Sequence, residues 1–316
     1  MPDALDSFLA DIDRTKLRII QPSKVVFLCG GAKANEAHLP PQNLRDYLLR
    51  TRNIEDKISA DFVLAESAQT LYRDTTYSDL IVFEEDIARI SGIVLVISES
   101  AGSLAELGAF SSNDTIRPTL RIIISEDKFD QESFVRFGPV QRIKNLGDER
   151  VGVFPWRSHK KGHIVQNSVA PIFKDIKDFI SGQVDGLANS FLYSGLNESR
   201  AFYDIFWLTH LANVIAPNTL YEAVNRIHPN LSHDDIRNHI FCMKVAGWMD
   251  KVSYSNKEYY YCKKDIDIFE YAYRSSAKSK DSIRRKLEIS TLFKNTDNPP
   301  TAVYKRAMTA RSGTKL

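Results

Sequence analysis

The segment Ile93–Phe110, with the sequence IVLVISESAGSLAELGAF, combines residues that could act on a sugar or a phosphate. An apolar run from Ile93 to Ile97 is typical of a buried strand, and it ends in small and polar residues before a helix that carries Glu106. Backbone N–H groups at such a junction can bind a ligand, and a carboxylate one turn into the helix can face the same ligand. Candidate ligand contacts in the turn are Ser98, Glu99, Ser100, Gly102 and Ser103.

Glu106 also has a purely structural interpretation. The sequence Ser103-Leu104-Ala105-Glu106 fits a capping box, in which the serine caps the helix and the glutamate reaches back to it. The two roles are compatible with each other. Spacing alone therefore does not decide whether Glu106 acts on a ligand.

A second turn of the same kind lies upstream, in the sequence KVVFLCGGAKAN that begins at Lys24. Val25–Leu28 is a continuous apolar run, as expected for a strand that is buried on both faces of a parallel sheet. Cys29, Gly30 and Gly31 then end the strand, and glycine lets the backbone approach a ligand without hindrance from a Cβ atom. The two strand ends could therefore flank one ligand-binding crevice.

Three motifs in this order, FLCGG, ESAGSLAELGAFS and FVRFGPVQR, resemble the nucleoside 2′-deoxyribosyltransferase-like effectors of bacterial retron defence systems. The resemblance implies that Glu106 is the nucleophile at the anomeric carbon of a sugar. It also implies that Glu84 binds the ribose, although Glu84 equally fits a solvated acidic helix start. The family usually has an aspartate where this chain has Ser100, and this difference favours hydrolysis or an altered substrate over base exchange.

Cleavage of an N-glycosidic bond passes through an oxocarbenium-like state that a carboxylate can stabilise or trap. The resemblance therefore implies a toxin-like N-glycosidase that acts on a nucleotide-type substrate and needs no cofactor. NAD⁺, cleaved between nicotinamide and ribose, is the first choice, because loss of a central metabolite would arrest growth. Hydrolysis of deoxynucleotides or nucleosides, or deoxyribosyl transfer between bases, is the second. A non-enzymatic nucleotide sensor that regulates DNA, with Glu106 only as a cap, is the alternative from another class.

Strand and helix patterns alternate through the first part of the chain. Strands are predicted at Val25–Leu28, Asp61–Leu64, Ile93–Ile97 and Leu120–Ile124, and helices at Asn43–Arg52, Tyr77–Ile90 and Leu104–Phe110. This alternation predicts an α/β fold, with a Rossmann-like parallel sheet and flanking helices. We expect an N-terminal helix (1–20), a deoxyribosyltransferase-like catalytic domain (21–185), a winged-helix domain (186–265) and a basic C-terminal tail (266–316).

The region after residue 200 follows the plan of a winged helix-turn-helix, with three amphipathic helices before a β-hairpin. Ser232 is the predicted N-cap of the third helix, which presents Arg237 and Lys244 but begins with Asp234 and Asp235. Because those acids would repel phosphates, contact with a protein–nucleic acid assembly is favoured over base reading. The resemblance implies that the assembly is the retron reverse transcriptase with its RNA-linked single-stranded DNA, which holds the effector inactive. It also implies a homo-oligomer.

Positive charge is concentrated at the C-terminal end of the chain. From Arg274 onward there are eleven lysines and arginines against three acids, a net charge of +8 in a chain whose total is only +2. A basic helical tail on an acidic body is typical of polyanion binding, with Arg284, Arg285 and Lys286 as candidate contacts. A solvated charged tail is the alternative.

Other classes are disfavoured by composition. The three cysteines, Cys29, Cys242 and Cys262, have no close spacing, which argues against a disulfide framework and against a metal site. The first residues are acidic and amphipathic, unlike a signal peptide. No apolar run approaches the roughly 18 residues that a membrane span needs. We therefore expect a cytoplasmic protein that does not bind membranes.

Overall fold

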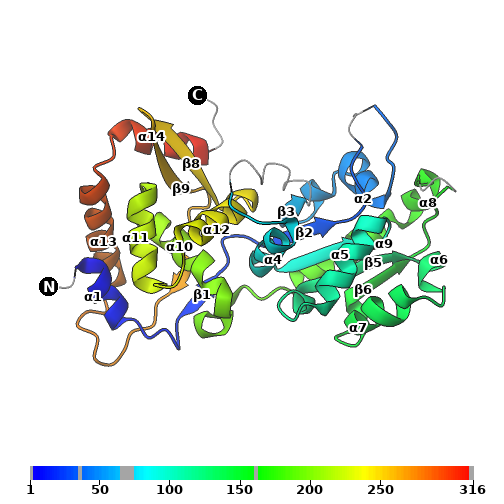
Figure 1. Ribbon diagram of the computed structural model, residues 1–316, viewed down its shortest axis with the longest axis horizontal. Coiled ribbons are helices and arrows are strands. Elements are labelled where there is room, and N and C mark those ends of the chain that lie inside the picture. Colours follow the sequence, from blue (N-terminus) through cyan, green and yellow to red (C-terminus); the bar gives the residue numbers. More distant parts are fainter. Residues whose placement is uncertain (1–2, 35–37, 65–74, 160–162, 313–316) are drawn as a thin grey trace. The chain divides into compact units, whose positions relative to one another are not determined.

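The chain forms two compact units. Figure 1 shows their helices and strands, coloured from the N-terminus to the C-terminus. The structure is a computed structural model that describes residues 3–34, 38–64, 75–159 and 163–312. Unit 2 comprises residues 24–70 and 79–187, whereas unit 1 combines residues 1–23, 71–78 and 188–316. Unit 1 is therefore assembled from three separate stretches of the chain.

Unit 2 is built on a five-stranded parallel sheet with the strand order β3-β2-β4-β5-β6. Its strands are β2 (Val25–Cys29), β3 (Asp61–Leu64), β4 (Ile93–Ile97), β5 (Leu120–Ser125) and β6 (Val151–Phe154). The sheet confirms the predicted α/β fold and each of the predicted strands to within one residue. Strand β6 was not predicted, because it is short and contains Gly152, a residue that weakens strand patterns.

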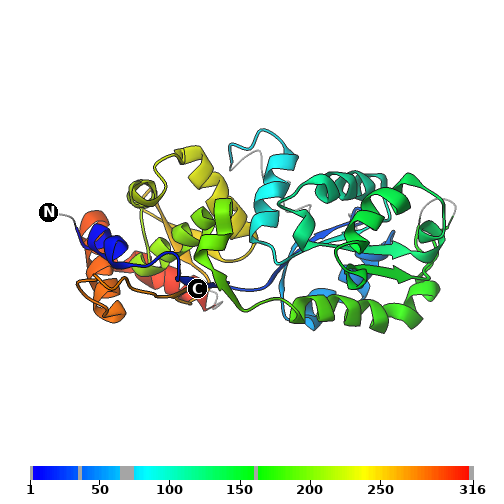
Figure 2. The ribbon, with the colours of Figure 1, turned by 90° about the horizontal axis from the view of Figure 1, so that it is seen from below.

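Helices cover both faces of this sheet (Figures 1 and 2). The unit contains α2 (Leu44–Asp46), α4 (Leu80–Ile90), α5 (Ala101–Ser112), α6 (Glu126–Phe129), α7 (Gln141–Lys144), α8 (Gln166–Val169) and α9 (Phe173–Asp185), with short 3₁₀ or π turns between them. On one face, Val26 and Leu28 pack with apolar residues of α9 such as Ile180. On the other face, the ring of Phe27 lies 6.4 Å from that of Phe110 in α5. Strand β2 is thus buried on both sides, as its continuous apolar sequence predicts.

Helix boundaries differ from the predicted ones where a capping side chain decides them. The predicted helix Tyr77–Ile90 begins only at Leu80, because the side chain of Asp79 accepts a hydrogen bond from the N–H of Val82 (3.1 Å). The predicted helix Leu104–Phe110 is longer at both ends, since it starts after Ser100. The predicted helix Asn43–Arg52 is a three-residue α-helix that continues as a π turn.

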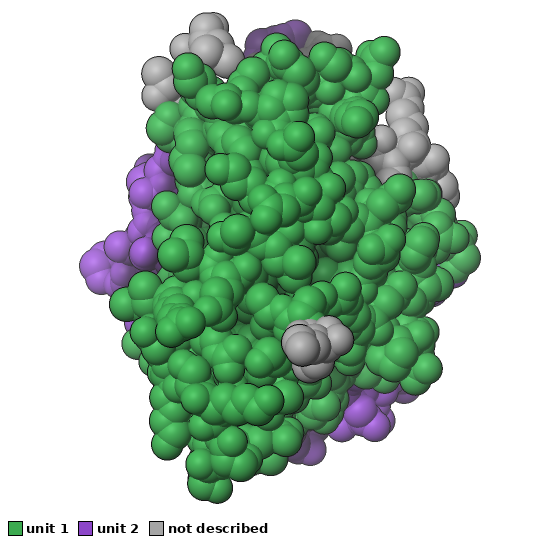
Figure 3. All heavy atoms as spheres, turned by 90° about the vertical axis from the view of Figure 1, so that its left-hand side faces the viewer, with its two compact units in different colours: residues 1–23, 71–78, 188–316 green, residues 24–70, 79–187 purple. Residues whose placement is uncertain are grey.

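Unit 1 is largely helical and is coloured green in Figure 3. Its helices are α1 (Ala4–Asp11), α10 (Arg200–Ala212), α11 (Pro217–Ile227), α12 (His233–Val245), α13 (Ser282–Asp297) and α14 (Thr301–Arg311). A small antiparallel sheet joins β1 (Arg18–Ile20) to β10 (Phe269–Glu270) and to β7 (Ser190–Leu192). A hairpin of β8 (Met249–Tyr254) and β9 (Lys257–Cys262) follows α12. Ser232 caps α12, as predicted, in a capping box with Asp235.

The basic C-terminal segment is folded as far as it is described. Helix α13 lies against α1, and the buried guanidinium of Arg285 bonds to the carboxylate of Asp11 and to the hydroxyl of Ser7 (3.0 Å). Helix α14 packs on the hairpin through Val303 and Ala307, which are buried with Tyr259 and Tyr261. The segment is therefore a helical part of unit 1, as a basic helical tail predicts, and the described part is not a loose solvated chain.

Replacement of Arg285 by alanine is expected to destabilise unit 1. The change would leave the Asp11 carboxylate buried without its partner, which typically lowers the free energy of unfolding by about 3 kcal/mol. Arg284→Ala is the matched control, because Arg284 is 74% exposed and pairs only with Glu288 of its own helix. Urea unfolding followed by tryptophan fluorescence would measure both variants, and equal midpoints for the two would contradict this assignment.

Candidate functional site

The carboxyl ends of β2 and β4 lie side by side, because the two strands pair in parallel with Cys29 opposite Val96. The turn after β4 contains Glu99, which is half-buried. Its carboxylate accepts hydrogen bonds from the N–H groups of Gly31 (3.1 Å), Leu44 (2.6 Å) and Arg45 (3.1 Å). Burial raises the pKa of Glu99, while these hydrogen bonds and the charge of Arg45 oppose the change. Through these three hydrogen bonds, Glu99 links the turn before α5 to the turn after β2 and to the start of α2.

The two glycines after β2 are explained by packing against protein side chains. A Cβ atom on Gly30 would lie 2.8 Å from the Cδ atom of Arg45, and one on Gly31 would lie 2.5 Å from the Nδ2 atom of Asn43. The sequence suggested instead that these glycines let a ligand approach. Cys29 is fully buried at the end of β2, where it is part of the sheet.

The start of α5 shows which residues cap this helix. The capping box is formed by Ser100 and Ser103: the Ser103 N–H donates to the Ser100 hydroxyl (3.1 Å), and the Ser100 N–H donates to the Ser103 hydroxyl (3.0 Å). The capping box therefore lies one helical turn before the pair Ser103 and Glu106 that the sequence allowed. Glu106 lies beyond the capping residues, half-buried on α5, so capping does not account for it.

Other residues of this turn occupy distinct environments. Ser98 is fully buried, and its N–H donates to the carbonyl oxygen of Ile123 (2.8 Å), which extends the pairing of β4 with β5. The Ser98 hydroxyl forms no hydrogen bond with any described residue. Gly102 is exposed in the first turn of α5, and a Cβ atom there would meet only the Ser100 hydroxyl, at 3.9 Å. The first turn of α5 is thus open around Gly102.

Glu84 on α4 and Glu106 on α5 form the pair of acids in this unit. Burial, and then the nearby negative charge of Glu106, raise the pKa of Glu84 to about 7. Its neighbours have structural partners, since Glu85 accepts a hydrogen bond from Asn113 (2.9 Å) and Asp86 pairs with Arg89. Of the three consecutive acids, Glu84 is the one that interacts with Glu106. A raised carboxyl pKa beside a second carboxylate is a common property of functional sites.

Sequence reasoning missed Lys128, a cation at the same end of the sheet. Its ammonium group donates a hydrogen bond to the carbonyl oxygen of Ser98 (3.1 Å). Burial lowers the pKa of Lys128, and the charge of Glu99 partly opposes this change. Lys128 lies on the short helix α6 directly after β5. Its position at the carboxyl end of a predicted strand was the only signal that could have indicated it.

The predicted nucleic-acid contacts fall into two groups. Arg284, Arg285 and Lys286 are all engaged within unit 1: Arg284 pairs with Glu288, Arg285 with Asp11, and Lys286 with Asp267 at 2.7 Å. Arg237 and Lys244 instead lie on α12 and line a hollow beside the hairpin. Of the three α13 cations, Arg285 is buried in its ion pair, whereas Arg284 is 74% exposed and stays at the surface.

The described part of the chain has neither a metal cluster nor a membrane helix. No group of three or more His, Cys, Asp or Glu side chains in it is arranged to hold a metal ion. None of its helices has both the length and the apolar character needed to cross a membrane.

The chain is thus an α/β protein with a five-stranded parallel sheet, in which Glu84 and Glu106 interact electrostatically. A family model described as STM3845 retron effector protein matches residues 41–251. Because this match covers more than half of the chain, the protein belongs to the STM3845 retron effector family. The resemblance to retron effectors is confirmed at this level.

Two Escherichia coli proteins are similar to this chain. "Retron Ec73 putative ribosyltransferase/DNA-binding protein" is 24% identical over 259 residues, which cover 78% of this chain and 81% of that protein. "Retron Ec86 putative ribosyltransferase/DNA-binding protein" is 31% identical over 130 residues, which cover 40% of this chain and 39% of that protein. Both names combine a sugar-transfer activity with DNA binding.

The Glu84 carboxyl is expected to make stability depend on pH. Below pH 4.5 it is protonated in both the folded and the unfolded chain, but between pH 4.5 and about 7 the unfolded chain loses the proton first. Ionisation of the buried group therefore destabilises the fold as the pH rises through this interval, and the effect is complete above pH 7. Glu84→Gln should melt at a higher temperature than the wild type at pH 8 and at the same temperature near pH 4.

The exposed Glu55 offers a control for this measurement. The difference in melting temperature between Glu55→Gln and the wild type should not change between pH 4 and pH 8. If the difference in melting temperature between Glu84→Gln and the wild type is also independent of pH, the pKa of Glu84 is not raised.

Glu99→Gln is expected to destabilise unit 2. The amide nitrogen of glutamine would face at least one of the three N–H donors, and a buried donor without an acceptor costs about 1–3 kcal/mol. Glu132→Gln changes an exposed side chain of the same unit, so its melting temperature should stay near that of the wild type. Thermal unfolding of both variants would test this, and an unchanged melting temperature for Glu99→Gln would disprove the structural role.

Proposed function

We propose that this retron effector cleaves the N-glycosidic bond of a nucleotide-type substrate, with Glu106 as the nucleophile. The observation that supports this role most strongly is the pairing of Glu106 with Glu84, whose pKa is raised to about 7. Glu106 is also not one of the two residues that form the capping box of α5. The family and the names of the two relatives are consistent with chemistry at a sugar.

In the proposed reaction, a carboxylate oxygen of Glu106 forms a bond to the anomeric carbon while the bond from that carbon to the base breaks. The bonding electrons leave with the base, and the negative charge of Glu106 stabilises the positive charge that develops on the sugar. Water then cleaves the sugar–enzyme ester, which gives hydrolysis and restores the carboxylate. Glu84, largely uncharged below pH 7, contacts a sugar hydroxyl without adding a second negative charge.

NAD⁺ is the first proposed substrate, and deoxynucleotides or deoxynucleosides are the second. Nicotinamide leaves NAD⁺ as a neutral molecule, so its departure needs no proton donor. This suits a turn in which Ser100 replaces the usual aspartate and is itself engaged in the capping box. Gly102, Ser103 and Lys128 are the proposed contacts for the remaining polar groups of the substrate.

We also propose that α10, α11, α12 and the β8–β9 hairpin form a winged helix-turn-helix. Three helices followed by an antiparallel hairpin match that plan, and both relatives carry DNA binding in their names. The proposed partner is the retron reverse transcriptase with its RNA-linked single-stranded DNA, which keeps the effector inactive. Exposed apolar side chains on unit 2, such as Ile81 (61%) and Phe134 (85%), support a homo-oligomer.

Product analysis would test the catalytic proposal. Purified protein, alone and with its reverse transcriptase–nucleic acid partner, would be incubated with NAD⁺, deoxynucleotides or deoxynucleosides, and free bases would be separated by chromatography. The wild type should release nicotinamide or a nucleobase, and Glu106→Gln should lower the rate by about a thousandfold or more, because it removes the nucleophile. Glu132→Gln, an exposed change on the same unit, is the control that should keep full activity.

Two results would contradict the proposal. One is release of the same base at the same rate by Glu106→Gln, which would mean that Glu106 is not the nucleophile. The other is the absence of free base in every condition together with growth arrest by Glu106→Gln in cells. That outcome would favour the non-enzymatic sensor.

A further inference from the structure

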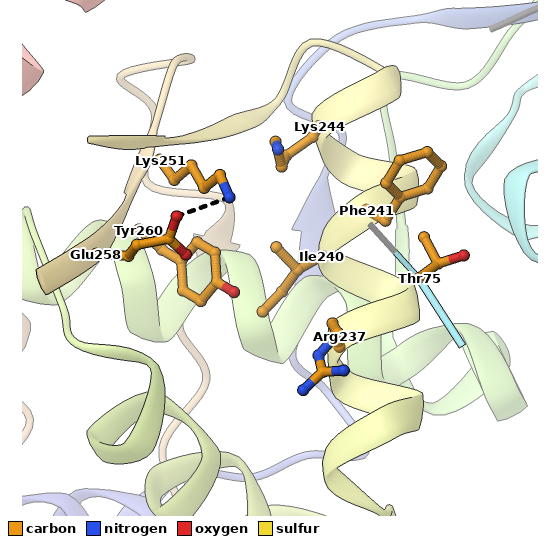
Figure 4. A pocket seen from close by; sticks show the side chains of 8 residues that line it. All are labelled: Thr75, Arg237, Ile240, Phe241, Lys244, Lys251, Glu258 and Tyr260. Carbon is orange, nitrogen blue, oxygen red and sulfur yellow. Dashed lines mark ion pairs between the residues drawn. The ribbon is translucent and has the colours of Figure 1, made fainter. Parts of the chain in front are cut away.

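A hollow of about 320 Å³ lies in unit 1 beside α12 and the β8–β9 hairpin (Figure 4). Its volume is at the lower end of the range for small-molecule sites, so it can hold one compact group. The lining residues that matter for recognition are Arg237, Ile240 and Lys244 on α12, and Lys251, Glu258 and Tyr260 on the hairpin.

The hollow carries an excess of positive charge that comes from α12. Arg237, Ile240 and Lys244 share one face of the helix, and Figure 4 shows this face directed toward the hairpin. On the opposite wall, Lys251 pairs with Glu258 at 2.8 Å, so their charges largely cancel.

The two α12 cations remain available to an anion. Arg237 has an ion pair with Asp234 at 3.6 Å, but Asp234 is 62% exposed, so this pair is weak. Within the described residues, Lys244 has no acid at ion-pair distance. Arg237 and Lys244 therefore attract one anionic group into the hollow.

An aromatic ring and an aliphatic side chain lie next to these cations. Tyr260 and Ile240 both line the hollow, and they are only 8% and 2% exposed. Burial, and then the neighbouring Tyr221, raise the pKa of Tyr260, so the phenol stays neutral. The accessible part of the Tyr260 ring, beside two cations, matches the chemistry of a nucleotide, in which a base contacts an aromatic ring while a phosphate is bound by arginine or lysine.

The start of α12 is poorly suited to enter the groove of a duplex. In helix-turn-helix proteins the first residues of the recognition helix contact base edges. Here those positions hold Asp234 and Asp235, and Asp235 is engaged with Ser232 in the capping box. The cations lie further along the helix, around the hollow. This arrangement favours an unpaired nucleotide over double-stranded DNA.

We propose that this hollow binds one unpaired nucleotide of a single-stranded nucleic acid, with the phosphate on Arg237 and Lys244 and the base against Tyr260. The inference rests on the proposed nucleic-acid role of the α10–β9 region and specifies the structure that it recognises. It does not depend on the glycosidase proposal for unit 2.

Fluorescence anisotropy with the full chain would test this inference. Three labelled DNA hairpins would be compared at one fixed salt concentration, because phosphate contacts depend strongly on salt. The first has a blunt end, the second a short single-stranded overhang, and the third the same overhang with abasic sites. The overhang should tighten binding about tenfold relative to the blunt hairpin, and the abasic overhang should lose most of this gain, because base stacking supplies it.

Variants then test whether residues of the hollow cause the higher affinity for the overhang hairpin. Lys244→Gln and Tyr260→Leu should each bring the ratio between overhang and blunt affinities close to one. Lys294→Gln removes the same charge from an exposed site on α13 and should keep the wild-type ratio. Because Tyr260 is buried, melting temperatures would be recorded for all variants, and Lys244→Gln gives an independent test if Tyr260→Leu does not fold.

Each remaining outcome overturns the inference in a recognisable way. If blunt and overhang hairpins bind equally, unit 1 binds nucleic acid but does not recognise an unpaired nucleotide. Equal binding of normal and abasic overhangs would mean that only phosphate charge is recognised, as expected if the hollow were built for an acidic protein segment. No binding of any hairpin would remove the nucleic-acid role itself.

Discussion

The half-buried carboxylate of Glu99 makes the interaction on which the geometry of the candidate site depends. A carboxylate partly removed from water needs hydrogen-bond donors, and three backbone N–H groups from residues 31, 44 and 45 supply them. These residues belong to the turn after β2 and to the start of α2. A single side chain thus holds two neighbouring strand ends in one arrangement, and α5 begins directly after it at Ala101.

The two units present charges of opposite sign to their proposed ligands. In unit 2, the negative charge of Glu106 raises the pKa of Glu84, and the Glu106 carboxylate is the group that would favour the positive charge that develops on a sugar during glycosidic cleavage. In unit 1, Arg237 and Lys244 supply positive charge to a hollow that also has an aromatic wall. Each arrangement suits a different part of nucleotide chemistry, the sugar in one case and the phosphate and base in the other.

Thr76 and Tyr77, shortly before α4, belong to unit 1 and are held on α12. Both the N–H and the hydroxyl of Thr76 donate to the side-chain oxygen of Asn238, at 3.0 and 3.1 Å, and the Tyr77 hydroxyl lies 3.1 Å from the sulfur of Cys242. Only Ser78 separates this segment from Asp79, which caps the helix that carries Glu84. The chain that bears one acid of the candidate site is therefore tethered to the helix that bears the cations of the hollow.

The sequence by itself determined the parallel sheet of unit 2, most of its strands and the order of helices in unit 1. These features depend on local patterns: continuous apolar runs for strands such as β4, and capping residues such as Ser232. It also singled out Glu106 and Glu84, but through a family resemblance. Spacing alone left Glu106 open to a capping role that belongs to Ser103.

Only the tertiary structure decided how each charged side chain is used. The sequence suggested Glu99 and Arg285 as ligand contacts, yet Glu99 is half-buried, Arg285 is buried, and both are bound to segments distant in the chain. Lys128 was marked only by its position after a predicted strand, because its partner, the carbonyl oxygen of Ser98, lies at another strand end. Hydrophobic periodicity is a local property that a sequence displays directly. The partner of a charge is set by long-range packing, and this is why the fold was predictable while the roles of the polar residues were not.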